Sequence, residues 1–340
     1  MSSFSSRFRP TPVNSGFRQD GYWVWCGSAL AEPGRGYHLY AARWPKTHSM
    51  FEGYIFLSEI VHAFSPTLLG PYRFVDRVLP SGDASRWDGR MAHNPTVHAY
   101  GGRYLLYYIA STYDGPAPNR EEAISDQRRR NQVYQNIKIG LAIADSPDGP
   151  WQNLDAPILL PRPGRWDSQI VTNPAPCVLP DGRIFLYYRS NTPQGLRIGL
   201  AVAQRPEGPY ERVQDEPVLQ GFNVEDPYVW HNGRHFEMIA KDITGDICGE
   251  IFAGAHFFSD DGISWRPAPS PRAYSRLVSY DDGSQAQLGC LERPQLLFGP
   301  DGEPQAFFAA AADGPGSFRK ADNTWNIAIP MAPAAPNCPH

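Results

Sequence analysis

Four segments of the sequence repeat one pattern, and this repetition constrains the fold more than any single residue does. Each copy has a polar or charged residue directly before a proline, then an apolar run, a glycine-containing turn and an aromatic-rich second run. The copies begin at Ala92, Thr172, Glu225 and Glu292, and a weaker copy without the proline begins at Val24. Repetition on this scale indicates an architecture of similar units that pack side by side.

A second pattern follows the first in the same rhythm. Steps of glycine, proline and an aromatic residue begin at Gly70, Gly149 and Gly208, and a related segment begins at Phe257. Each unit is therefore predicted to contain two hairpins, which supply the four short strands of a propeller blade. We predict an all-β, single-domain, five-bladed β-propeller over residues 1–340, with blades near residues 20–80, 88–160, 167–220, 222–275 and 285–330.

Residues 114–135 depart from the blade pattern. This segment is polar and charged, and Asn119 is suited to cap a helix within it. It interrupts blade 2 and is interpreted either as a solvated surface insertion or as a flap over the site. Its charge favours the surface insertion.

Composition narrows the classes of function. The net charge of −4 gives no broad basic field, so a nucleic-acid partner is not expected. No apolar stretch approaches the ~20 residues that a membrane span needs. The N-terminal segment lacks an apolar signal core, and the five cysteines lack close metal-type spacing. These features predict a cytoplasmic protein with reduced thiols, and they leave its oligomeric state open.

Polar residues stand directly before the prolines of the repeated pattern. In a propeller the innermost strands surround the axis, so these residues are expected to converge there. A structural repeat alone would need small or apolar residues at these places. The predicted substrate-binding residues of this group are His93, Asn94, Asn173, Glu225 and Arg293.

The carboxylates of Asp226 and Glu292 are the sharpest part of this group. Two carboxyl groups brought together from different blades suit glycosidic cleavage, in which one donates a proton and the other activates water. A third acid such as Glu225 would raise the pKa of the proton donor by repulsion. The alternative is that these acids only pair with arginines or backbone donors around the axis.

A third recurrence is an arginine followed two residues later by an aspartate. It contains Asp20, Asp88 and Asp167, and the last two each stand six residues before an asparagine of the proline-containing strands. A repeated aspartate is often a turn residue, so a structural role competes with a catalytic one.

Further substrate-binding residues, Asp167 of the third recurrence among them, are proposed from their places in the repeats. Trp25, Trp87 and Trp166 are expected near the ends of the strands that face the site, where they would stack on sugar rings or fill gaps between blades. Lys241 follows the second strand of blade 4, which indicates a binding loop or a simple strand end. No cofactor is expected to be required. Histidine spacing gives no support to an axial ion such as Ca²⁺, although His93 and an acid could hold one.

The pattern over residues 21–330 resembles the five-bladed β-propeller glycoside hydrolases, the group of arabinanases, α-L-arabinofuranosidases, β-xylosidases and anhydro-L-galactosidases. "VEDPYVW" is similar to the strand with their pKa-tuning aspartate, and "LERPQLL" to the strand with their general acid. The resemblance implies Asp226 as the tuning residue and Glu292 as the acid. The favoured hypothesis is an exo-acting, inverting glycosidase that removes a terminal sugar from a plant- or algal-type oligosaccharide.

The general base departs from the pattern of this group. The family pattern has an aspartate on an upstream inner strand, where this sequence has His93-Asn94-Pro95. Asp88 is the favoured base because its loop leads into that strand, and His93, Asp20 and Asp167 are the alternatives. Two other functions stay open. One is a non-catalytic carbohydrate-binding propeller, and the other is a glycoside phosphorylase, which would need Arg293, Lys241 and Arg189 together at the axis.

Overall fold

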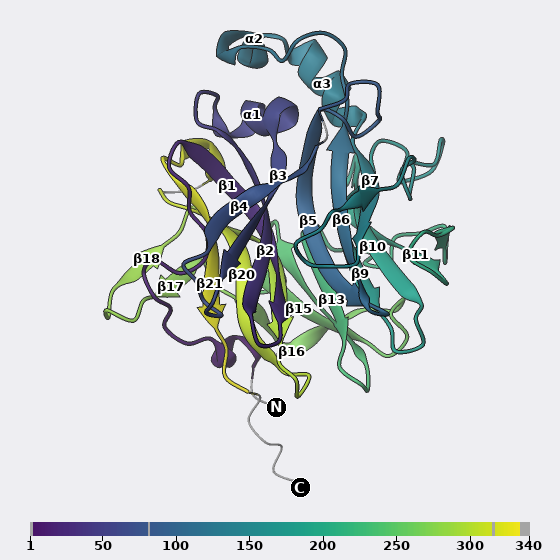
Figure 1. The fold of residues 1–340 in the computed structure, drawn as a ribbon. Helices are drawn as coiled ribbons and strands as arrows, with labels where there is room; N and C mark the ends of the chain where they lie inside the picture. Colours follow the sequence, from purple (N-terminus) through teal and green to yellow (C-terminus); the bar gives the residue numbers. More distant parts are fainter. Residues whose placement is uncertain (1–2, 81, 315–316, 334–340) are drawn as a thin grey trace, which may run out of the picture.

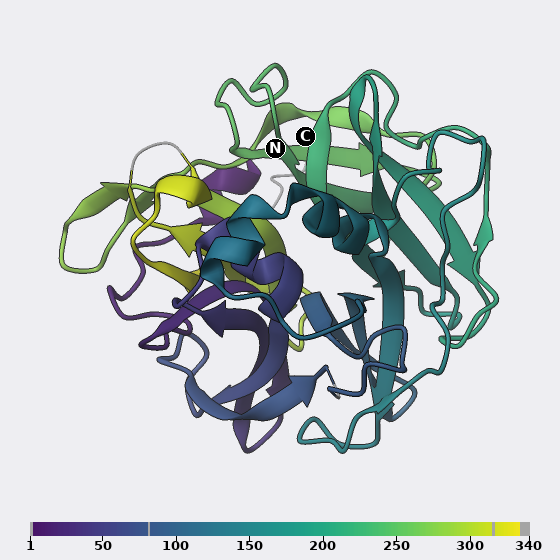
Figure 2. The same ribbon diagram turned by 90° about the horizontal axis from the view of Figure 1, so that it is seen from above.

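Five antiparallel sheets lie around one central axis, as Figures 1 and 2 show. This computed structural model describes residues 3–80, 82–314 and 317–333. Within each sheet every strand pairs with the next strand of the chain, so each blade is a simple meander. The predicted all-β, five-bladed propeller is confirmed.

The strands of each blade follow the two predicted hairpins. Their bounds are β1 (Tyr22–Glu32), β2 (Gly36–Pro45), β3 (Glu59–Ser65) and β4 (Arg73–Leu79) in blade 1; β5 (Met91–Tyr100), β6 (Arg103–Ser111), β7 (Lys138–Ala144) and β8 (Gln152–Asn153) in blade 2; β9 (Thr172–Val178), β10 (Ile184–Thr192), β11 (Gly195–Ala203) and β12 (Glu211–Arg212) in blade 3; β13 (Val224–His231), β14 (Phe236–Asp242), β15 (Gly254–Ser259) and β16 (Arg266–Tyr274) in blade 4; and β19 (Cys290–Phe298), β20 (Pro304–Ala312) and β21 (Thr324–Pro330) in blade 5. A small hairpin, β17 (Leu277–Ser279) with β18 (Gln285–Gln287), joins the last two blades. The first strands β1, β5, β9, β13 and β19 contact one another in sequence and close the inner ring.

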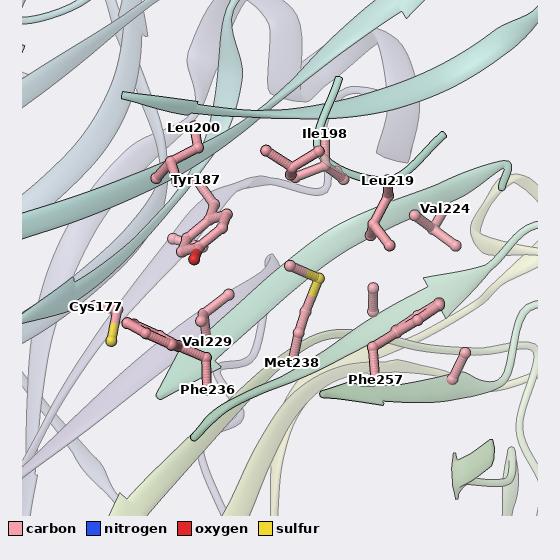
Figure 3. Close-up of a cluster of buried hydrophobic side chains, with 14 of the residues drawn as sticks. Cys177, Tyr187, Ile198, Leu200, Leu219, Val224, Val229, Phe236, Met238 and Phe257 are labelled. Carbon is pink, nitrogen blue, oxygen red and sulfur yellow. The ribbon is translucent and has the colours of Figure 1, made fainter. Parts of the chain in front are cut away.

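Apolar side chains fill the space between neighbouring blades. Between blades 3 and 4, Tyr187 and Leu200 pack with Val229 and Met238 (Figure 3). The hydroxyl of Tyr187 donates to the carbonyl oxygen of Gly262 at 2.7 Å, so this large buried ring leaves its polar end satisfied. Burial on both faces explains why the repeats read as apolar runs with aromatic residues.

The N-terminal and C-terminal segments of the described residues meet on blade 5, which has three strands of its own. Phe17 forms an antiparallel bridge with Asn326 of β21, and Phe8 forms another with Met331. Phe17 is 1% exposed and packs with Phe308 and Ala328 of this blade. The N-terminal segment therefore takes the place of a fourth strand and closes the propeller.

Residues 114–135 form two helices, α2 (Arg120–Ser125) and α3 (Gln127–Gln135). The expected cap at Asn119 is confirmed, because its side chain accepts from the backbone of Glu122 while the Glu122 carboxylate accepts from the backbone of Asn119. Ala123 and Val133 are buried against α1 (Met50–Leu57), and all three helices lie over one end of the axis (Figures 1 and 2). Most residues of the insertion are exposed, as expected for a surface insertion, while one face of it is packed against a helix of blade 1.

None of the helices in the described part of the chain combines the length and the apolar character that crossing a bilayer requires.

Replacing Phe17 with alanine tests the closure of the ring. Phe17→Ala should lower the free energy of unfolding by about 3–5 kcal/mol, because it leaves a cavity between the N-terminal segment and blade 5. Urea unfolding measures the loss. Val13→Ala is the control, since Val13 is 50% exposed in the same segment, and it should change stability by no more than ~0.5 kcal/mol. Equal effects of the two substitutions would contradict this account of closure.

Candidate active site

Each innermost strand carries one residue with a left-handed backbone. The positive φ angles are 47° at Cys26, 53° at Asn94, 52° at Asn173, 56° at Asp226 and 55° at Arg293. Each lies where the pairing of the first and second strands shifts register, as at a β-bulge. Left-handed backbone is uncommon outside glycine, so its recurrence once per blade marks these five positions as equivalent.

Hydrogen bonds link these five side chains into a floor across the axis. The Cys26 thiol donates to Oδ1 of Asn94 at 2.8 Å, and Nδ2 of Asn94 donates to Oδ1 of Asn173 at 2.9 Å. Nδ2 of Asn173 donates to Oδ1 of Asp226 at 2.6 Å. The backbone N–H of Arg293 donates to Oδ2 of Asp226 at 3.3 Å. The asparagines therefore orient a chain of dipoles that ends on the Asp226 carboxylate.

The residues directly before this floor form the walls of a cavity of about 260 Å³. One comes from each blade: Trp25, His93, Thr172, Glu225 and Glu292. The roof comes from outside the repeats, with Met50, Phe51 and Tyr54 of α1, Tyr134 of α3 and Phe318 of the short helix Phe318–Lys320. The insertion thus lies over the site, as the flap interpretation expected.

Lys241 joins two carboxylates in the wall. Its Nζ lies 3.0 Å from Oε2 of Glu225 and 2.8 Å from Oε1 of Glu292. Arg189 also ion-pairs with Glu225, at 3.5 Å from Oε1. These four charged residues come from four different strands, β10, β13, β14 and β19, so only the folded propeller assembles them.

The pKa values of the adjacent acids are moved in opposite directions. Burial alone raises the pKa of Glu225, but Lys241 and Arg189 outweigh it and hold that pKa at about 2. Burial and the Glu225 charge raise the pKa of Asp226 to about 6, although Arg293 acts against them. Near neutral pH Glu225 is therefore ionised, and Asp226 is the acid of this pair that takes up a proton first.

His93 is a neutral imidazole in the wall. Burial, followed by the charge of Arg293, lowers the pKa of His93 to about 3. Its Nδ1 lies 2.8 Å from the Ser58 hydroxyl, and its ring packs against Tyr54 with centroids 4.9 Å apart. These contacts fix the ring and leave it a positioning or hydrogen-bonding group.

The structure brings most of the predicted residues together. Nine of them line the cavity: Trp25, His93, Asn94, Asn173, Glu225, Asp226, Lys241, Glu292 and Arg293. The sequence did not indicate Trp44 of β2 or the roof residues Tyr54, Tyr134 and Phe318. The three roof residues come from connections that do not repeat. The aromatic content of α1 and α3 was the only available signal.

Asp88 and Trp87 do not line the cavity, which corrects their predicted places. The Asp88 carboxylate accepts from Nε of Arg86 at 3.0 Å, from the Tyr108 hydroxyl at 2.7 Å and from Nδ2 of Asn153 at 2.8 Å. The Trp87 ring stacks on Tyr108 at an interplanar angle of 10°. These contacts use the side chains to join strands within blade 2, so the structural interpretation of the motif fits better.

Blade 3 repeats this arrangement at Asp167 and Trp166, which also lie away from the cavity. The Asp167 carboxylate accepts from Arg162 at 2.9 Å, from Arg212 at 2.7 Å and from the Tyr188 hydroxyl at 2.8 Å. Trp166 stacks on Tyr188, again at 10°. Asp20, the third member of the motif, is exposed in a turn.

One group with metal-ligand spacing lies outside the cavity. Among the described residues, His38, His62 and Asp148 place their ligand atoms within 4.8 Å of one another. Asp148 already ion-pairs with Arg35, and His38 is hydrogen-bonded to both His62 and Glu32, each at 2.8 Å. These partners account for the cluster without an ion.

Comparison with known proteins shows which solved structures share this fold. Neither a protein-family model nor a curated protein matches the sequence. Among solved structures, a family 117 glycoside hydrolase of Zobellia galactanivorans is similar with a TM-score of 0.68, 18% identity and coverage of 96% of this chain and 90% of that chain. The catalytic domain of a family 62 α-L-arabinofuranosidase of Coprinopsis cinerea is similar with a TM-score of 0.65 and 11% identity, over 97% of this chain and 98% of that chain. An endo-arabinase of Bacteroides thetaiotaomicron is similar with a TM-score of 0.58 and 12% identity, over 96% of this chain and 98% of that chain. The chain therefore has the five-bladed propeller fold of several glycoside hydrolase families.

Replacing Asp88 separates its structural role from a catalytic one. Asp88→Asn and Asp167→Asn should each lower the free energy of unfolding by about 2 kcal/mol, less than the ~3–5 kcal/mol of a fully buried pair because the arginine partners reach solvent. Urea unfolding measures this, and Asp20→Asn is the exposed control. A stable Asp88→Asn variant whose only defect is catalytic would reinstate Asp88 as the base.

The pH dependence of stability tests the environment of Asp226. Because its folded pKa lies above the ~3.9 of an unfolded aspartate, its contribution is present at low pH and is lost as pH rises through about 6. Between pH 4 and 7 the wild type should lose on the order of 2 kcal/mol relative to Asp226→Asn. Urea unfolding across this range measures the difference. A difference that is constant with pH would show that Asp226 ionises normally.

Proposed function

We propose that this protein is a glycoside hydrolase that removes a terminal sugar from an oligosaccharide. The observation that carries the proposal is the pair of carboxylates, Glu225 and Glu292, which neighbouring blades hold on either side of Lys241 in the wall of the cavity. Paired carboxyl groups at a sugar-sized site are the machinery that glycosidic cleavage requires. The glycosidases with the same fold, among them arabinose-releasing enzymes, support this assignment.

The size of the cavity supports exo action. Its volume of about 260 Å³ is below the ~300–1,000 Å³ of most small-molecule sites and suits about one sugar ring. The floor closes one end, and the roof helices restrict the other. A chain end can enter such a space, whereas the interior of a long polysaccharide cannot pass through it.

We assign the acid role to Glu292 and the second carboxylate role to Glu225 in place of Asp88. Glu225 is ionised, its side chain is 21% exposed, and two cations hold it at the cavity wall. Asp226 lies beneath both acids, and its charge interacts with Glu225 and Glu292, as expected of a residue that tunes their protonation. Lys241 positions both working groups.

The spacing of the two carboxylates favours retention of anomeric configuration. Since Lys241 Nζ contacts both, their bonded oxygens lie within about 6 Å of each other, nearer the ~5–5.5 Å of retaining enzymes than the ~6.5–9.5 Å of inverting ones. In this scheme Glu225 attacks the anomeric carbon while Glu292 protonates the leaving oxygen. Glu292 then deprotonates the water that releases the sugar. This proposal replaces the inverting mechanism expected from the sequence.

Phosphorolysis is the second candidate. Arg189, Lys241 and Arg293 are far apart in the sequence but all line the cavity, as the phosphorylase hypothesis required. Turnover that depends on inorganic phosphate would favour it. The non-catalytic alternative rested on the missing base, and Glu225 offers a carboxylate for that role.

Glutamine variants of the two glutamates test the assignment. With an oligosaccharide, Glu292→Gln should lower turnover at least ~10²-fold, the usual scale of general acid catalysis. With an activated aryl glycoside its loss should be smaller, because that leaving group needs little protonation. Glu225→Gln should abolish turnover of both substrates. Steady-state kinetics on a panel of aryl glycosides and oligosaccharides measures these effects.

Glu237→Gln, in blade 4 but outside the cavity, is the matched control and should keep wild-type turnover. NMR of the first-formed sugar reports the anomer. Full activity of Glu292→Gln on an oligosaccharide would reject the acid assignment, and an inverted product would reject Glu225 as nucleophile.

A further inference from the structure

Arg293 lines the cavity and has two donors without a hydrogen-bond partner. Its Nε and Nη2 are buried and have no hydrogen-bond partner within the described residues, and the residue is 3% exposed. In a guanidinium group these two nitrogens lie on one edge, where their N–H bonds run parallel. That edge is the fork which binds two oxygens of one planar acceptor.

The other edge of Arg293 is only weakly engaged. Its Nη1 lies 3.5 Å from Oδ1 of Asp226, at the limit of a hydrogen bond, and that oxygen already accepts from Asn173 at 2.6 Å. Cys26 is a neighbour, but burial raises the pKa of its thiol, although Arg293 acts in the opposite direction. Asp226 is therefore the carboxylate that pairs with the charge of Arg293, and this pair does not use the edge formed by Nε and Nη2.

The two other cations of the cavity are better matched. Lys241 contacts two carboxylates, at 3.0 and 2.8 Å. Arg189 ion-pairs with Glu225 and also donates to Asn191 at 2.5 Å and to the Tyr134 hydroxyl at 3.3 Å. Arg189 also has one buried nitrogen without a hydrogen-bond partner, Nε, whereas Arg293 has two on one edge. Arg293 is therefore the cation of the cavity with the most unsatisfied donors among the described residues.

We propose that Arg293 binds the carboxylate of a uronic acid, so that the terminal sugar of the substrate is acidic. That the ligand is a sugar rests on the proposed function, whereas the presence of a carboxylate on the ligand is inferred from the free edge of the Arg293 guanidinium. A carboxylate offers two coplanar oxygens and a negative charge to the free edge. Two hydroxyls of a neutral sugar would fill the same donors but would bring no negative charge to the free edge.

Binding of free sugars to the purified full-length protein tests this inference without any need for turnover. Titration calorimetry compares D-glucuronate, D-galacturonate, D-mannuronate and L-guluronate with the corresponding neutral sugars. At least one uronate should bind about tenfold or more tightly than its neutral counterpart, since a buried charged partner is lost in the latter. This wild-type comparison stands even where a variant fails to fold.

Variants of Arg293 test whether this residue is the one that binds the uronate. Arg293→Lys keeps the charge but removes the fork, and Arg293→Gln removes both, so each should reduce uronate binding about tenfold or more. Arg197→Lys is the matched control. Arg197 donates to backbone carbonyls in blade 3 outside the cavity, and this substitution should leave binding unchanged.

The outcomes separate this inference from the proposed function. Equal affinity for a uronate and its neutral counterpart, or no binding of any uronate, would overturn the proposal that Arg293 binds a carboxylate. Binding of inorganic phosphate alone, lost in Arg293→Lys, would also overturn it in favour of a phosphate site. Uronate binding without hydrolysis of any uronide would keep this inference and reject the hydrolase. Hydrolysis of neutral glycosides alone would support the hydrolase and reject the carboxylate-binding role of Arg293.

Discussion

The register shift on each innermost strand is the constraint on which the site depends. It places one residue per blade in the left-handed region, at a cost of about 1–3 kcal/mol for each residue that is not glycine. The hydrogen bonds from Cys26 through the two asparagines to Asp226 help to offset this cost. The same shift exposes the preceding residue of each strand to the cavity. A single backbone feature, repeated five times, thus builds both the floor and the wall.

Charge balance in the cavity follows from this geometry. Lys241 contacts Glu225 and Glu292 because β13 and β19, which carry the two acids, are neighbouring inner strands, and β14, which carries Lys241, pairs with β13. Shared cations hold Glu225 ionised, while burial moves Asp226 the other way. The two adjacent acids therefore differ in protonation: Glu225 stays ionised, whereas Asp226 takes up a proton as the pH falls through about 6.

The Arg-x-Asp motif illustrates how repetition separates structure from chemistry. In blades 2 and 3 the aspartate accepts from an arginine and a tyrosine hydroxyl, and a tryptophan stacks on that tyrosine. Gly140 and Gly199 lie against these tyrosine rings, where an added Cβ would come within 2.6 and 2.4 Å of ring carbons. The unit therefore fastens the outer strands of a blade. The floor residues, by contrast, differ from blade to blade at equivalent positions, which is where chemistry can vary.

The sequence by itself determined the propeller, its five blades and most of the cavity wall. It could do so because each blade repeats a local pattern of strands and turns, and position in that pattern predicts distance from the axis. Residues such as Asn94, Asp226 and Glu292 were found in this way. The tertiary structure alone showed that Asp88 faces the interior of its blade, because its partners Tyr108 and Asn153 come from strands that only the folded blade brings to it. It also decided that Lys241 joins Glu225 to Glu292 and that α1 and α3 form the roof, since these contacts lie between segments that share no pattern.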